Sequence, residues 1–155
     1  WEAEGRPTTA DVASLSAKSY AATKAEARIR SRQDMLANID SAAEQVLDAR
    51  AAGRFLAQDP EPRPGMRGGH IPGSLNLPYP ALLGEHGTYK SAAELQAAFD
   101  DAGIQPGKPI ATTCGSGVTA CTLALGLYLI GRDDVAIYDG SWSEWGARQD
   151  TPIES

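Results

Sequence analysis

The sequence predicts an α/β fold in which a central parallel sheet is covered by helices on both faces. Two observations favour this class. Short apolar runs typical of buried strands alternate along the 155-residue chain with longer segments of helical periodicity, and glycine and proline clusters separate them. Strands that alternate with helices form parallel sheets with both faces buried. The length is sufficient for one domain with its own core.

The first third of the chain divides into a linker and the start of a domain. Residues 1–27 are polar and alanine-rich and show no strand pattern, so we expect an extended linker with some helix there, and one domain over 28–155. Ser31 is expected to cap a helix that runs to about Ile39. A short buried strand is expected over 45–49.

The remainder of the chain continues the alternation of strands and helices. The proline- and glycine-rich stretch 57–69 is expected to be a loop. Ser91 and Glu94 match a capping box at the start of a helix, and Ser141 and Glu144 are expected to cap a last short helix in the same way. The helix that begins at Ser91 is expected to end near Gly103. The other expected features are a turn at 70–73, strands at 74–77, 109–113 and 134–138, and a helix at 117–130.

The most informative segment is the loop Thr-Cys-Gly-Ser-Gly-Val-Thr-Ala at 113–120. An apolar strand leads into it and an apolar helix leads out, so Cys114 stands at a strand end in a glycine-rich turn that opens a helix. Backbone N–H groups and the positive end of a helix dipole both favour a thiolate over a thiol. Asp48 stands at another strand end, and parallel sheets bind ligands outside the carboxyl ends of their strands. The sequence therefore predicts that Cys114 is a nucleophile.

Composition limits the other function classes. The net charge of −6 and the pI of about 4.8 argue against nucleic acid as a main partner. No apolar stretch approaches the ~18 residues of a membrane span, and no signal-peptide pattern is present. Two cysteines cannot form a disulfide framework, which favours a reducing, cytoplasmic compartment, and with two scattered histidines they form no zinc pattern. Neither a metal nor another cofactor is expected.

Four short motifs lie between about Val46 and Gly146. They are Leu-Asp-Ala-Arg at 47–50, Gly-His-Ile-Pro-Gly-Ser-Leu-Asn at 69–76, the Cys114 loop, and Tyr-Asp-Gly-Ser-Trp at 138–142. Each motif is weak singly, but in this order and spacing they make the chain resemble a rhodanese-type sulfurtransferase domain. The resemblance implies a rhodanese-like α/β fold and a catalytic cysteine.

The cysteine loop is more similar to the mercaptopyruvate branch of this family than to the thiosulfate branch. Thiosulfate-specific relatives carry Arg and Lys where this chain has Gly115 and Ser116. The stretches 53–55 and 61–63 also resemble the mercaptopyruvate branch. Those enzymes contain two rhodanese domains, of which the second carries the cysteine. Because the chain begins at Trp1 with a segment that resembles the tail of a first domain, we expect the second, catalytic domain with its linker, and a missing first domain as its partner.

The resemblance implies a two-step sulfur transfer. The Cys114 thiolate attacks the thiol sulfur of 3-mercaptopyruvate, pyruvate leaves as its enolate, and a thiol such as thioredoxin, or cyanide, then takes the outer sulfur of the persulfide. Ser116 is expected to donate to the substrate carbonyl or to Cys114. Arg54 and Arg63 are expected to bind the carboxylate. The backbone N–H groups expected to hold the persulfide come from Gly115, Gly117, Val118 and Thr119.

Other chemically capable residues have simpler interpretations. Arg50 is expected to form a structural ion pair with Asp48 or another carboxylate. His70 is expected to hold a turn, and His86 to be solvated. Cys121 lies within the apolar helix and is expected to be buried as a small hydrophobic residue. The alternative role of Ser116 is that of a helix cap. The alternative for Arg54 and Arg63 is that they are solvated at the surface, as most arginines are.

Three other functions compete with mercaptopyruvate chemistry. A thiosulfate sulfurtransferase or general persulfide carrier would use the same cysteine, but the dianionic thiosulfate suits a cationic loop. The neutral loop of this chain favours mercaptopyruvate, provided that cations are supplied elsewhere. A cysteine phosphatase needs Arg six positions after its cysteine, where this chain has Ala120. A non-catalytic interaction module does not need the cysteine that this chain carries.

Overall fold

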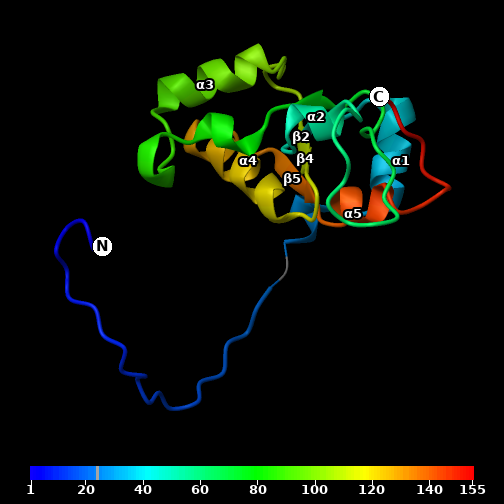
Figure 1. The fold of residues 1–155 in the computed structure, drawn as a ribbon. Coiled ribbons are helices and arrows are strands. Elements are labelled where there is room, and N and C mark those ends of the chain that lie inside the picture. Colours follow the sequence, from blue (N-terminus) through cyan, green and yellow to red (C-terminus); the bar gives the residue numbers. More distant parts are fainter. Residues whose placement is uncertain (24) are drawn as a thin grey trace.

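A computed structural model describes residues 1–23 and 25–155, so Lys24, within the predicted linker, lies outside the described residues. The chain forms a five-stranded sheet in the order β1-β5-β4-β2-β3, and every neighbouring pair is parallel (Figure 1). The strands are β1 Ile29–Arg30, β2 Gln45–Asp48, β3 Leu75–Asn76, β4 Ile110–Thr113 and β5 Val135–Tyr138. The predicted α/β fold with a parallel sheet is therefore confirmed.

Four of these strands lie within predicted ranges, and β1 was not predicted. A strand of two residues is too short to show an alternating pattern, so β1 forms only because its edge position lets it pair with β5. The helices are α1 Arg32–Ser41, α2 Ala52–Phe55, α3 Ala92–Asp101, α4 Val118–Leu129 and α5 Ser141–Trp145, with single 3₁₀ turns η1 Glu26–Arg28, η2 Tyr79–Leu82 and η3 Glu85–Gly87. α2, η2 and η3 are one-turn elements that helical periodicity does not reveal.

Helices cover both faces of the sheet, and each face has its own core. Successive residues of a strand point to opposite faces, so Leu47 packs with α3 and α4 while its neighbour Val46 packs with α1 and α5. The first core is centred on Phe99 and Leu123, and the second on two buried tryptophans of α5. The predicted two-sided covering of the sheet is confirmed.

Two of the three predicted helix caps are confirmed. The hydroxyl of Ser31 accepts a hydrogen bond from the backbone N–H of Asp34, and the Asp34 carboxylate accepts one from the backbone N–H of Ser31, so α1 begins as predicted. The hydroxyl of Ser91 and the carboxylate of Glu94 form the same reciprocal pair at α3. α1 continues to Ser41, two residues beyond the predicted end.

The predicted cap of α5 is wrong. Gly140 occupies the cap position without any side-chain hydrogen bond, and Ser141 is the first residue of the helix, with a φ of +51°. The Ser141 hydroxyl turns into the protein and the Glu144 carboxylate accepts a hydrogen bond from the Tyr138 hydroxyl at 2.7 Å. Neither side chain therefore caps the helix. Ser141 instead contacts the cysteine loop, and Glu144 contacts the buried Tyr138.

The N-terminal segment extends away from the sheet (Figure 1). Residues 1–23 contain a turn but neither a helix nor a strand, and each of them is exposed. The stretch 57–69 likewise forms the loop that its composition predicts. Among the described residues, no helix combines the length and the apolar character needed to cross a membrane.

Candidate active site

Cys114 lies at the carboxyl edge of the sheet, where the sequence analysis expects it. It follows β4, whose last residue Thr113 pairs in register with Asp48 at the end of β2. The turn of the cysteine loop, residues 114–117, connects β4 to the N-terminus of α4. Gly117 is the cap of α4 with a φ of +84°, and a Cβ there would lie 3.0 Å from the Asp139 carbonyl oxygen. This position therefore requires glycine.

The sulfur of Cys114 is surrounded by hydrogen-bond donors. The residue is 1% exposed, and the backbone N–H of Ser116 donates to Sγ at 3.4 Å. Burial alone raises the pKa of the Cys114 thiol. Hydrogen bonds from the Thr119 hydroxyl, the backbone of Ser116 and Ala120, and the Ser141 hydroxyl outweigh burial and bring the pKa below its ordinary value. The environment thus favours the thiolate, which is the nucleophilic form of cysteine.

The first residues of α5 hold the cysteine loop from the other side. The backbone N–H of Trp142 donates to the Cys114 carbonyl, and that of Ser143 to the Gly115 carbonyl, both at 2.9 Å. The backbone N–H of Cys114 donates to the Ser141 hydroxyl at 3.2 Å. These contacts were not predicted, because the spacing of Ser141 and Glu144 indicates a helix cap and the motif at 138–142 does not reveal a contact with Cys114.

A cavity of about 120 Å³ lies beside the loop and brings together four of the predicted site residues. Arg54, Arg63, Gly115 and Ser116 all line it, and Glu61 and Ser143 complete its polar wall. Val118, by contrast, is 72% exposed, so its side chain extends into solvent. Ser116 is exposed and approaches Cys114 through its backbone.

The two predicted carboxylate-binding arginines reach the cavity in different ways. Arg54 comes from α2 and its side chain is 26% exposed, with Nε and Nη2 donating to Glu61 at 3.2 and 2.6 Å. Arg63 comes from the 57–69 loop and donates to the Ser143 hydroxyl at 2.6 Å. Ser143 in turn donates to the carbonyl of Gly115. Both guanidinium groups therefore border the loop that carries the cysteine.

A network of ion pairs connects Arg54 to the end of β2. Arg50 forms the predicted ion pair with Asp48 at 2.7 Å, and both side chains are 1% exposed. Arg50 also donates to Glu61 at 2.9 Å and stacks over the ring of Trp142 at 4.2 Å. The structural role predicted for Arg50 is confirmed, and the network joins the end of β2 to the cavity wall.

The two histidines have the structural and solvated positions predicted for them, whereas the prediction for Cys121 is wrong. His70 Nδ1 lies 2.8 Å from the Phe55 carbonyl and its ring stacks on Phe55, as expected for a residue that holds a turn. His86 is exposed, as predicted. Cys121 was predicted to be buried, but it is exposed. Because α4 is apolar on all sides, with Leu125 also 47% exposed, apolar neighbours do not identify its buried face.

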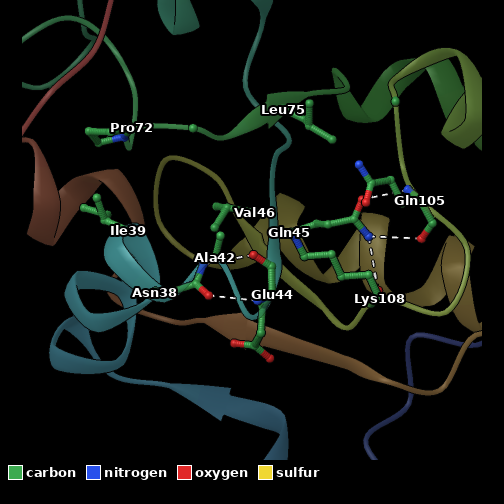
Figure 2. A pocket seen from close by; sticks show the side chains of 12 residues that line it. Asn38, Ile39, Ala42, Glu44, Gln45, Val46, Pro72, Leu75, Gln105 and Lys108 are labelled. Atoms are coloured by element: carbon green, nitrogen blue, oxygen red, sulfur yellow. Dashed lines mark hydrogen bonds between the residues drawn. The ribbon is translucent and has the colours of Figure 1, made fainter.

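A second cavity, of about 190 Å³, lies at the amino edge of the sheet (Figure 2). The side-chain amides of Asn38 and Gln45 in its wall are hydrogen-bonded within the protein. Asn38 donates to and accepts from the backbone of Glu44, while Gln45 donates to the carbonyls of Gln105 and Lys108 and accepts from the N–H of Gln105. These amides lie at the amino end of β2 and are not reactive groups. The candidate nucleophile lies in the cysteine loop, at the opposite edge of the sheet.

The fold and the site together define the class of protein. The model of the family described as the rhodanese-like domain matches residues 31–148. The chain therefore belongs to the rhodanese-like domain family.

Relatives within this family are sulfurtransferases of two kinds. The chain is 50% identical over 120 residues to the 3-mercaptopyruvate sulfurtransferase of Rattus norvegicus, an alignment that covers 77% of this chain and 40% of the relative. It is 42% identical over 149 residues to the thiosulfate sulfurtransferase of the same organism, covering 96% of this chain and 50% of the relative. The chain thus spans half or less of the length of these relatives.

A solved structure supports the same assignment. The crystal structure of SseA from Escherichia coli, a 3-mercaptopyruvate sulfotransferase, superposes with a TM-score of 0.79 at 35% sequence identity. The superposition covers 93% of this chain and 53% of that one.

Proposed function

We propose that this chain carries the catalytic site of a sulfurtransferase that takes sulfur from 3-mercaptopyruvate through a persulfide on Cys114. The observation that carries the proposal is the combination of a hydrogen-bonded cysteine, whose pKa lies below its ordinary value, with a neutral loop and two guanidinium groups beside that loop. A neutral loop suits a donor whose single negative charge is bound away from the reacting sulfur. Arg54 and Arg63 supply that binding charge.

The first half-reaction is attack of the Cys114 thiolate on the thiol sulfur of the donor. An S–S bond forms as the C–S bond breaks, and the electron pair of the C–S bond passes to carbon as the enolate of pyruvate. The enolate takes one proton to give pyruvate, which is balanced by ionisation of the persulfide. Donors near the keto oxygen stabilise the developing enolate, and the exposed Ser116 hydroxyl is the candidate for this role.

The second half-reaction removes the outer sulfur. A thiol or cyanide attacks it, the S–S bond breaks, and Cys114 leaves as a thiolate ready for the next cycle. The hydrogen bonds that lower the pKa of Cys114 also make it a better leaving group. A thiol acceptor and a reducing compartment are part of the proposal, as is a further domain that completes the site, since the relatives are about twice as long.

A thiosulfate sulfurtransferase is the second candidate, and the 42% identity to the rat enzyme of that name favours it. Relative efficiency with the two donors distinguishes the candidates. We expect kcat/KM for mercaptopyruvate to exceed that for thiosulfate in the full-length protein, with cyanide as acceptor. A higher value for thiosulfate would reject the first candidate and support the second.

A further inference from the structure

Glu61 is an unexpected residue in a cavity proposed to bind an anion. Its side chain is 2% exposed, yet the residue lines the cavity beside Gly115 and Ser116. A buried carboxylate close to an anionic donor opposes binding by charge repulsion unless it has another purpose. Its contacts indicate what that purpose is.

The carboxylate of Glu61 fixes the position of Arg54. Oε1 accepts hydrogen bonds from Arg50 Nη1 at 2.9 Å and from Arg54 Nε at 3.2 Å, and Oε2 accepts from Arg54 Nη2 at 2.6 Å. The fork formed by Nε and Nη2 of Arg54 is thus occupied from one side. Within residues 1–23 and 25–155, Nη1 and the second proton of Nη2 have no hydrogen-bond acceptor and are available to a ligand. A Cβ built on Gly115 would lie 3.2 Å from Nη2. Arg54 is therefore held against the cysteine loop.

Glu61 also sets the charge of the cavity. The charged side chains in its wall are Arg54, Arg63 and Glu61, which give a formal charge of plus one. Behind them, Asp48 and Arg50 cancel each other as a buried pair. The wall can therefore neutralise one negative charge on a donor. A second negative charge would face both Glu61 and the Cys114 thiolate without compensation.

We propose that Glu61 determines donor selectivity, by holding Arg54 in place and by keeping the wall at one net positive charge. It selects monoanionic 2-oxo acid thiols such as 3-mercaptopyruvate over the dianion thiosulfate. This inference rests on the proposed function and deepens it, because it assigns selectivity to a residue outside the cysteine loop. Matching of charge discriminates between ligands mainly through the repulsion it imposes on the wrong one.

Glu61→Gln tests the inference because it removes the charge and keeps the shape. In the full-length protein, with cyanide as acceptor, we expect KM for mercaptopyruvate to rise because Arg54 is no longer held in place. We expect KM for thiosulfate to fall because its second negative charge no longer faces Glu61. The ratio of the two kcat/KM values should move towards thiosulfate by about tenfold or more. Adding Arg54→Gln to Glu61→Gln returns the wall to plus one, so the double variant should regain the wild-type ratio at lower overall activity.

Matched controls separate this role from a structural one. Asp133→Asn removes one negative charge from an exposed residue next to the amino end of β5 and should leave the ratio unchanged. Thermal unfolding of each variant reports whether it is folded. If Glu61→Gln does not fold, Pro62→Lys adds the same charge to the cavity wall at an exposed position outside the cysteine loop and should move the ratio in the same direction.

The outcomes also separate this inference from the proposed function. If the wild-type protein forms no Cys114 persulfide with mercaptopyruvate, the proposed function fails. If it does, but the ratio is unchanged in folded Glu61→Gln, or in Pro62→Lys where that variant is used, the selectivity role of Glu61 is overturned.

Discussion

The reactivity of Cys114 depends on opposing effects within a few ångströms of its sulfur. Burial favours the neutral thiol, whereas hydrogen bonds from Thr119, Ser116 and Ala120 favour the thiolate and prevail. The thiolate is therefore present at pH values above a midpoint that lies below that of an ordinary cysteine. As the pH falls through that midpoint, the sulfur is protonated and the nucleophile is lost.

Thr119→Val should raise the pKa of Cys114, because it removes the largest of the hydrogen bonds that lower it while keeping the side-chain shape. The pH dependence of alkylation by iodoacetamide measures this pKa, in a Cys121→Ser background so that only one thiol reacts. We expect the midpoint to move to higher pH with little change in the plateau rate. An unchanged midpoint would mean that the Thr119 hydroxyl does not act on the sulfur.

Arg63→Ala should raise KM for mercaptopyruvate about tenfold with a smaller change in kcat, because it removes the charge-assisted hydrogen bond proposed for the substrate carboxylate. Steady-state kinetics of the full-length protein provide the measurement. Arg148→Ala, which removes an exposed arginine paired with Asp150, is the matched control and should leave KM unchanged. Equal effects of the two substitutions on KM would show that Arg63 does not bind the substrate carboxylate.

At the scale of elements, the cysteine loop is positioned by the start of α4 on one side and the start of α5 on the other. Sequence reasoning located the loop, because a cysteine among glycines between an apolar strand and an apolar helix is a local pattern. It did not find Ser143, whose partner Arg63 lies 80 residues away along the chain. It also misassigned Ser141 and Cys121, because spacing alone does not tell which way a side chain points.

Gly117→Ala should destabilise the fold by about 2 kcal/mol, because the residue combines a positive φ with a Cβ 3.0 Å from the Asp139 carbonyl. Gly131→Ala is the matched control. Gly131 also has a positive φ, of +86°, but a Cβ there meets open space, so the cost should be about 1 kcal/mol. Urea unfolding compares the two, and equal costs would show that the contact with Asp139 is absent.

At the scale of the whole molecule, the parallel sheet gathers residues from four separate segments at one edge. The network that starts at Asp48 in β2 passes through Arg50 and Glu61 to Arg54 and so joins the sheet to the cavity wall. The sequence predicted the Asp48–Arg50 pair, since the two residues are two positions apart. The role of Glu61 was not predictable, because it depends on how the 57–69 loop folds back over α2.

Asp48→Asn should reduce the free energy of unfolding by about 3 kcal/mol, because it leaves the buried Arg50 with only part of its counter-charge. Asp133→Asn, an exposed control, should change it by less than about 0.5 kcal/mol. Chemical denaturation checks both values. A cost for Asp48→Asn no larger than that of the control would show that the network does not stabilise the fold.

The most direct test of sulfur transfer through Cys114 is intact-protein mass spectrometry after exposure of the full-length protein to 3-mercaptopyruvate. We expect the mass of one sulfur atom to be added, the addition to map to the peptide that contains Cys114, and cyanide to remove it. Cys114→Ser should show no addition. A wild-type protein that stays unmodified while pyruvate is released, or an addition that persists in Cys114→Ser, would contradict the account.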